Sequence, residues 1–166
     1  PIKNISELCF TVRKINNSDN SRIFGLKRLV MEHPKVIIFY NYNYELDILK
    51  ESLTSLEVPF TEWNGHLHED ILVGDRWAYL VNYSSAAEGW NCITTDTIIF
   101  YSDNYSYKIM TQAAGRINRL NTPYDHLYYY HLVSDSPIDR SIRNTLLRKK
   151  KFNEATFLKK QNIHFG

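Results

Sequence analysis

Short apolar segments alternate with amphipathic segments along this chain, and this alternation restricts its fold more than any other feature. The apolar segments are rich in β-branched and aromatic residues, which is typical of buried strands. Strands are predicted over residues 36–41, 60–65, 78–83, 96–102 and 126–134. Strands that are apolar along their whole length indicate a parallel sheet that helices cover on both faces. The sequence therefore predicts an α/β fold with a doubly wound, mainly parallel sheet and helices on both faces.

Amphipathic segments with helical spacing separate most of these strands. In the first of them Ile23, Leu26 and Val30 fall on one helical face, and a His-Pro pair ends the helix. Helices are predicted over residues 21–33, 44–56, 105–120 and 136–160. Ser136 and Pro137 are typical of an N-cap and a first helical position. Gly115 interrupts the third of these helices.

Length and composition indicate one globular domain. With 166 residues, of which 43% are hydrophobic and 23% charged, the chain can bury one substantial core. We expect a single domain over residues 1–166, with residues 1–20 as an entry strand or linker and residues 136–160 as a C-terminal helix. No apolar stretch approaches the roughly 20 residues of a membrane helix, so no membrane partner is expected. The first residues lack the features of a signal peptide, and a start at Pro instead of Met suggests a piece of a longer protein.

The two cysteines, Cys9 and Cys92, are too few for a disulfide framework or a zinc site. The simplest interpretation is an intracellular, cytoplasmic protein with both thiols reduced. The net charge of +2 favours no particular partner, although the C-terminal end is locally basic.

The most specific motif is QAAGRINR, which runs from Gln112 to Arg119. Arg116 and Arg119 are three residues apart, so a helix would present both guanidinium groups on nearly one face. Arginine suits a developing phosphate charge because it is always ionised and offers a rigid fork of donors. Gly115 would let another backbone or a nucleotide approach closely. Taken alone, the motif is equally well explained by a surface helix whose arginines pair with local carboxylates.

A second motif is the loop of small residues that joins two predicted strands between Ser84 and Asn91. Ligands of open parallel sheets bind at the carboxyl ends of the strands, where this loop must lie. Ser84, Ser85 and free backbone N–H groups can hold a phosphate or a ribose hydroxyl there. By itself, the loop is also explained as an ordinary connection between elements.

Together, the two motifs resemble the C-terminal helicase lobe of superfamily 2, in particular its Swi/Snf-like branch. The fifth motif of that family is an Ala/Gly-rich loop that ends in Gly-Leu-Asn, and residues 86–91 are similar to it, with Trp90 in place of Leu. The sixth motif, Gln-x-x-Gly-Arg-x-x-Arg, is matched at Gln112, Gly115, Arg116 and Arg119. Residues 36–49 are similar to the fourth motif, and the resemblance extends over residues 21–145.

The resemblance implies a RecA-like lobe that binds ATP together with a second lobe. Arg116 and Arg119 resemble the arginine fingers that reach ATP across the cleft between lobes, and Gln112 resembles the residue that couples their helix to the nucleotide. The loop that contacts ATP or the facing lobe is matched by Glu88, Gly89 and Asn91. The positions that resemble contacts to a nucleic-acid backbone are Asn41, Gly65, Asn82, Tyr83 and Ser84.

Two departures from the family pattern affect these assignments. Asn82 stands where the fifth motif usually begins with Ser or Thr, although an amide can still donate to a phosphate. The segment between Gly65 and Ala78 is short. The family usually has a full helix there, whereas residues 66–77 can supply two turns at most or a loop.

The sequence lacks the motifs that hold ATP in such motors. It contains no GxxxxGK[ST] phosphate loop and no Asp-Glu pair after an apolar strand to hold Mg²⁺. We therefore expect both ATP and Mg²⁺ to be held mainly by an N-terminal RecA-like lobe outside this sequence. The chain alone is expected to be inactive.

Other features are weaker signals. The cluster His66–Asp70 resembles a set of metal ligands, but no further ligand is evident nearby, and no metal site is expected. Tyr128–Tyr130 could stack bases, but core packing is favoured because helices should cover both faces of the sheet. Arg148–Lys151 is explained equally by contacts to phosphates and by a solvated helix face. Asp103 and Asp139 are assigned no acid or base role, because no His or carboxylate stands at a spacing that indicates one.

The predicted function is that of the second motor lobe of a nucleic-acid-dependent ATPase, a helicase or translocase. The expected partner is DNA, with RNA as the other possibility. The alternative is a non-catalytic RecA-like module that binds nucleic acid or protein. Arginine fingers exposed at the carboxyl edge of the sheet, beside residues 88–91, favour the motor, whereas arginines held in internal salt bridges favour the module.

Overall fold

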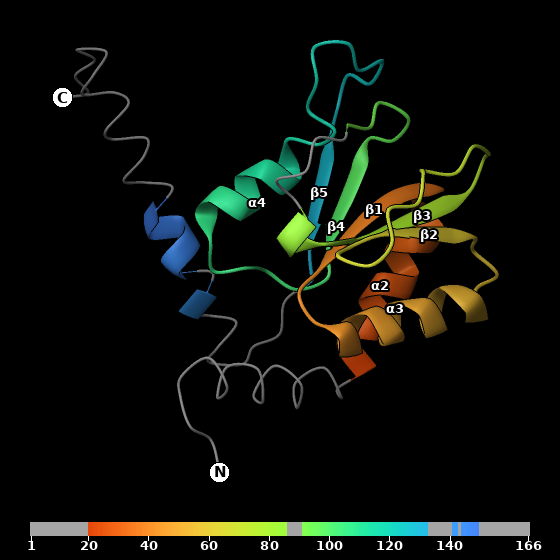
Figure 1. Cartoon of the computed structure of the whole chain (residues 1–166), viewed down its shortest axis with the longest axis horizontal. Helices are drawn as coiled ribbons and strands as arrows, with labels where there is room; N and C mark the ends of the chain where they lie inside the picture. The colour runs from red at the N-terminus through yellow and green to blue at the C-terminus, as the bar shows by residue number, and fades with distance from the viewer. Residues whose placement is uncertain (1–19, 86–90, 133–140, 143, 150–166) are drawn as a thin grey trace.

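In the computed structural model, which describes residues 20–85, 91–132, 141–142 and 144–149, five strands form one parallel sheet (Figure 1). The strands are β1 (Lys35–Tyr40), β2 (Phe60–Trp63), β3 (Trp77–Asn82), β4 (Thr97–Phe100) and β5 (Tyr128–His131). Their order is β2-β3-β1-β4-β5, and every neighbouring pair is parallel. β1 therefore lies at the centre, and its apolar sequence is buried on both faces.

Helices cover both faces of this sheet. The helices are α2 (Asn20–Glu32), α3 (Asn43–Ser55) and α4 (Tyr107–Ala114), and residues 144–149 are also helical. α2 and α3 pack on one face, and α4 packs on the other. The predicted α/β fold, with a parallel sheet between two helical layers, is confirmed.

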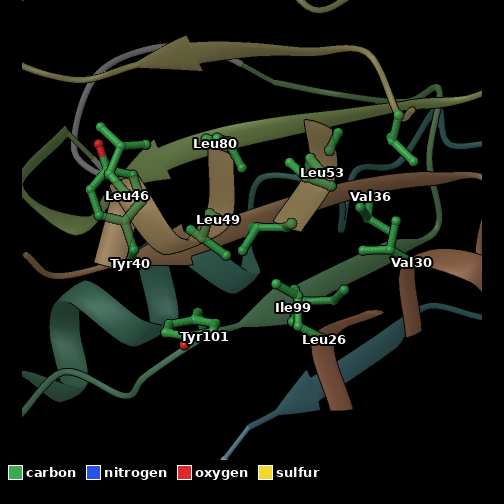
Figure 2. Close-up of a cluster of buried hydrophobic side chains, with 13 residues drawn as sticks. Leu26, Val30, Val36, Tyr40, Leu46, Leu49, Leu53, Leu80, Ile99 and Tyr101 are labelled. Carbon is green, nitrogen blue, oxygen red and sulfur yellow. The ribbon is translucent and has the colours of Figure 1, made fainter. Parts of the chain in front are cut away.

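Alternation along each strand divides the core into two clusters. The first joins α2 and α3 to one face of the sheet through Leu26, Val30, Leu49, Leu53 and the inward side chains of β1, β3 and β4 (Figure 2). The second joins α4 to the opposite face through Phe39, Val81, Phe100, Met110 and Ile117. In β1, for example, Ile38 belongs to the first cluster and Phe39 to the second, as the period of two in a strand requires.

The connection between β2 and β3 is a loop. No helix is present in residues 64–76, so the segment is the loop that the sequence offered as the alternative to a short helix. The loop is fixed to the sheet because the His68 ring stacks on Trp63, with centroids 4.3 Å apart, and the Tyr79 hydroxyl donates to the Glu69 carbonyl oxygen at 2.6 Å. His68 thus has a structural contact.

α4 is shorter than predicted. The Ser106 Oγ caps its start by accepting a hydrogen bond from the Ile109 N–H at 3.2 Å, and the helix ends at Ala114 with Gly115 as its C-cap. The prediction of a helix over residues 105–120 is wrong at its C-terminal end. Arg116 and Arg119 consequently follow the helix and do not share a helical face.

The prediction that Tyr128–Tyr130 pack in the core is wrong for its first two members. β5 is an edge strand in the described sheet, and 42% of Tyr128 and 36% of Tyr129 are exposed. Tyr130 does pack against the first core cluster, and its hydroxyl lies 2.9 Å from His33 Nε2. An edge position, which the residues themselves do not reveal, explains the difference.

The helix predicted over residues 136–160 is only partly described. Residues 141–142 and 144–149 are helical, whereas Ser136 and Pro137 lie outside the described residues. Residues 1–19 also lie outside them. Among the helices that are described, none combines the length and apolarity of a membrane span.

Candidate nucleic-acid and nucleotide surfaces

Polar residues follow the carboxyl ends of four neighbouring strands. Asn41 follows β1, Asn64 follows β2, Asn82 ends β3, and Asn104 comes four residues after β4. Because all strands are parallel, these amides lie along one edge of the sheet, which we call the carboxyl edge. This is the edge at which open parallel sheets bind ligands.

Asn41 is the centre of a hydrogen-bond network along the carboxyl edge. Its Nδ2 donates to Ser102 Oγ at 2.8 Å and to the Asp103 carbonyl oxygen at 3.1 Å. Its Oδ1 accepts from Asn104 Nδ2 at 2.8 Å, and its carbonyl oxygen accepts from Asn82 Nδ2 at 3.3 Å. Both amide hydrogens of Asn41 are thus engaged within the chain: its side chain joins β1 to the segment after β4, and its backbone carbonyl oxygen joins β1 to β3.

A buried carboxylate supports this network from below. Glu45, in the first turn of α3, is fully buried, and its Oε1 accepts from the backbone N–H of Asn41 at 2.8 Å and of Tyr42 at 3.1 Å. The same oxygen accepts from Ser102 Oγ at 3.0 Å. Buried carboxylates persist only when hydrogen bonds compensate the loss of hydration, and these donors supply that compensation. Glu45 therefore fixes the turn that carries Asn41.

A cavity of about 380 Å³ lies at the ends of β2 and β3, and three of the predicted nucleic-acid positions line it: Gly65, Asn82 and Ser84. Ser84 is exposed, and its backbone N–H donates to Asn82 Oδ1 at 2.9 Å. A Cβ atom built on Gly65 would meet no other atom within 4 Å, so the chain itself does not require glycine there.

Tyr40 supports these residues from the core. Burial raises the pKa of the Tyr40 hydroxyl, and hydrogen bonds with the side chains of Asn64 and Asn82 oppose that shift. The hydroxyl thus links the side chains that follow β2 and end β3. Asn64 is also fixed by its own turn, since its Oδ1 accepts from the N–H groups of His66 at 2.8 Å and Leu67 at 3.0 Å.

The other two predicted nucleic-acid positions, Tyr83 and Asn41, are engaged within the chain. Tyr83 is 2% exposed, and its hydroxyl donates to the Ser102 carbonyl oxygen at 2.7 Å, so its side chain belongs to the core. Asn41 has no amide hydrogen left for a ligand. Only Gly65, Asn82 and Ser84 among the predicted positions therefore offer groups that a nucleic acid can reach.

The predicted arginine fingers lie at the other end of α4. α4 begins beside the carboxyl edge and runs back along the sheet, since the carbonyl oxygen of Ala114 accepts from the hydroxyl of Tyr129 near the start of β5, at 3.1 Å. Arg116 and Arg119 are therefore not at the carboxyl edge, contrary to the expectation for a motor. A crossover between parallel strands must return to the amino ends of the sheet, and this reverses the position of the helix terminus.

The fifth and sixth motifs nevertheless meet in space. Arg119 Nη2 donates to Asn91 Oδ1, and the Cys92 N–H donates to the Arg116 carbonyl oxygen at 3.0 Å. Arg119 Nε is buried and has no hydrogen-bond partner among the described residues, and no described carboxylate forms a salt bridge with this side chain. We call residues Asn91, Arg116 and Arg119 the arginine site.

The other predicted residues of this region have different surroundings. Arg116 is only 7% exposed. Gln112 is half-buried on α4, one turn before the arginines. Glu88 and Gly89 lie outside the described residues, so their place relative to Arg119 stays a prediction.

Asp103 and His131 form a close pair that their spacing along the chain did not indicate. His131 Nδ1 lies 2.6 Å from Asp103 Oδ1, and the His131 ring stacks on Phe100 with centroids 4.6 Å apart. The pairing of β4 with β5 places His131 opposite Phe100 and so brings it to Asp103. Among the described residues there is no group of three or more His, Cys, Asp or Glu side chains arranged to hold a metal ion.

The described fold is that of a RecA-like lobe, and comparisons with known proteins agree. The C-terminal part of the Fun30 ATPase domain has a similar structure, with a TM-score of 0.67 and 20% identity, over 84% of this chain and 53% of that chain. No family model matches the chain.

Curated relatives point to one class of ATPase. The chain is 23% identical over 134 residues to the chromatin-remodeling ATPase INO80 of Gibberella zeae, a match that covers 75% of this chain and 7% of the relative. It is 25% identical over 158 residues to the helicase domino of Drosophila melanogaster, covering 85% of this chain and 4% of the relative. The chain thus spans less than a tenth of either protein. The resemblance to the C-terminal lobe of Swi/Snf-like superfamily 2 ATPases is confirmed.

Proposed function

We propose that the chain is the second motor lobe of a nucleic-acid-dependent ATPase, and that Arg119 is an arginine finger toward ATP bound at the interface with an N-terminal lobe. The meeting of Arg119 with Asn91 is the observation that carries this proposal. It joins two motifs, 28 residues apart in sequence, that face the nucleotide in the family that the chain resembles.

The chemistry of the arginine site fits an anionic ligand. A guanidinium is always ionised and has five N–H donors, and among the described residues Arg119 donates only from Nη2 to Asn91, so donors remain for a phosphate oxygen. Asn91 holds the group through a neutral acceptor, so a phosphate does not have to displace a carboxylate of the described residues. ATP and Mg²⁺ would be held mainly by the preceding lobe, and Arg119 would stabilise the charge that develops on the transferred phosphoryl group.

Nucleic acid is proposed to lie along the carboxyl edge, over the cavity at the ends of β2 and β3. There Ser84 offers an exposed hydroxyl and Gly65 an open backbone, and the half-buried amide of Asn82 lines the same cavity. These groups are neutral donors, which position a phosphate backbone without reading its sequence. DNA is the proposed ligand because the curated relatives are named as a chromatin-remodeling ATPase and a helicase.

Replacement of Gly65 by alanine tests this surface. Because the added Cβ meets no atom of the chain within 4 Å, the melting temperature should change little. If a phosphate backbone approaches Gly65, the methyl group should weaken DNA binding by roughly fivefold or more, the equivalent of about one hydrogen bond. Fluorescence anisotropy of the longer protein with a labelled duplex measures this. Gly74→Ala, in the same loop but with a φ of +149°, should instead lower stability.

Steady-state ATP hydrolysis tests the function as a whole. The longer protein that contains this chain should hydrolyse ATP faster when DNA is added, whereas the isolated chain should show no turnover. Turnover by the isolated chain would mean that ATP is held entirely within it. A longer protein without DNA-stimulated turnover would contradict the motor.

One observation favours the alternative, a non-catalytic RecA-like module. Arg116 is nearly as buried as a core residue, and a guanidinium in that state is engaged within its own domain. Under this alternative, Arg116→Ala would lower the stability of the chain, and Arg119→Ala would leave ATP turnover unchanged. The motor instead predicts a loss of turnover from Arg119→Ala at unchanged stability.

A further inference from the structure

The two proposed ligand surfaces lie at opposite ends of α4, and a chain of hydrogen bonds connects them. The helix has eight residues and is therefore about 12 Å long. Its N-terminus adjoins the carboxyl edge, and its C-terminus leads into the arginine site. A motor needs its nucleic-acid surface and its nucleotide site to influence each other, and this chain of hydrogen bonds offers a route for that influence.

Asn104 is the link between the carboxyl edge and α4. Its Nδ2 donates to Asn41 Oδ1 at 2.8 Å, and its Oδ1 accepts from the Ser106 N–H at 2.9 Å. Ser106 in turn caps α4 through the Ile109 N–H. One carboxamide thus holds the network around Asn41 with its nitrogen and the start of the helix with its oxygen.

The connection continues in both directions. Toward the nucleic-acid surface, Asn82 Nδ2 donates to the carbonyl oxygen of Asn41 at 3.3 Å, and Asn82 lines the proposed binding cavity. Toward the arginine site, the backbone N–H of Gly115 donates to Thr111 at 3.0 Å, and that of Arg116 donates to Ala113 at 3.2 Å. The segment that carries the arginines is therefore attached to the helix as a unit.

We propose that Asn104 is a positioning residue that couples occupancy of the nucleic-acid surface to the placement of Arg119. The inference rests on the proposed function and adds to it a residue that touches neither ligand. A nucleic acid bound at Asn82 and Ser84 stabilises the Asn41 network, the Asn104 carboxamide transfers that constraint to the start of α4, and the helix carries it to Arg119. Coupling of this kind requires that both sites bias the same element, and α4 is that element.

Asn104→Asp removes one of the two hydrogen bonds of Asn104, the bond to Asn41, and keeps the other, the bond from the Ser106 N–H. Aspartate keeps an oxygen that accepts from the Ser106 N–H, but it cannot donate to Asn41 Oδ1. Asn41 cannot compensate by rotating its amide without losing its bonds to Ser102 and Asp103. Asn104→Ala removes both hydrogen bonds. If the link to Asn41 carries the coupling, the two substitutions should have similar effects.

The readout is the ratio of ATP turnover with saturating DNA to turnover without DNA, measured on the longer protein at saturating ATP. Substitutions within coupling networks change coupling by about 0.5–2 kcal/mol, so this ratio should fall roughly 2- to 30-fold in both variants. Turnover without DNA should stay within about twofold of wild type, because Asn104 lies outside the arginine site. Asn121→Asp, the same change at an exposed site, is the matched control and should leave the ratio unchanged.

A wild-type ratio for Asn104→Asp would overturn the coupling, while a wild-type protein that DNA does not stimulate would overturn the proposed function itself. Ser102→Ala gives a second arm should the aspartate variant fail to fold. It removes the hydroxyl that accepts from Asn41 and donates to Glu45, so it loosens the same network without touching Asn104. It too should lower the ratio, and an unchanged ratio in a folded Ser102→Ala protein would contradict the proposal.

Discussion

Arg119→Ala should reduce ATP turnover of the longer protein by roughly 10³- to 10⁵-fold, the range that arginine fingers contribute in phosphoryl transfer. The loss arises because the guanidinium would stabilise charge that develops only in the transition state, so ATP binding should change much less than turnover. Steady-state hydrolysis and equilibrium binding of ATP, measured on the same preparation, separate the two quantities.

Arg28→Ala is the matched control for this substitution. Arg28 is exposed on α2 and pairs with Glu32 one helical turn away, a contact worth about 0.3–0.5 kcal/mol. Its loss removes the same charge from the same domain and should leave turnover near that of wild type. Equal losses from Arg28→Ala and Arg119→Ala would assign the effect to net charge or stability, and the finger would be refuted.

Phe39→Ala should lower the free energy of unfolding by about 3–5 kcal/mol, as expected for a fully buried phenylalanine. Phe39 lies on the central strand and stacks on Tyr83 and Phe100, with ring centroids 5.4 Å and 5.9 Å away. Its removal leaves a cavity beneath the residues that carry the carboxyl edge. Urea denaturation followed by tryptophan fluorescence measures the change.

Phe24→Ala makes the same chemical change at an exposed position. Phe24 is 71% exposed on α2, so its loss should change the free energy of unfolding by no more than about 0.5 kcal/mol. A large destabilisation at Phe24 would mean that another part of the protein covers this face. Equal effects at the two positions would contradict the two-layer core described above.

Most of the fold could be predicted from the sequence because the apolar pattern is local. The run from Val36 to Tyr40 is buried on both faces and forms the central strand, as its uniform apolar character indicates. The predicted boundaries of α2, α3 and β3 lie within about one residue of those observed. Errors arose where tertiary position decides the outcome, as at β5, whose tyrosines cannot show that the strand lies at an edge.

The candidate site was predictable only in part. The family motifs pointed to Asn91 and Arg119, and the structure brings these side chains together, although their roles stay proposals. The periodicity of residues 105–120 did not show that the helix ends at Gly115, since a C-cap depends on backbone geometry. Asn104 was missed because its partner, Asn41, is 63 residues away and only the strand order makes them neighbours.

A structure of the longer protein with DNA and a mimic of the ATP transition state would show directly whether Arg119 reaches ATP. If Arg119 is an arginine finger, its guanidinium will lie within about 2.7–3.2 Å of an oxygen of the phosphate mimic, a normal hydrogen-bond distance. Arg119 would then either have lost its hydrogen bond to Asn91 or donate to Asn91 and to the nucleotide at the same time. A closed complex in which Arg119 stays on Asn91, with another group against the terminal phosphate, would show that Arg119 is not the finger.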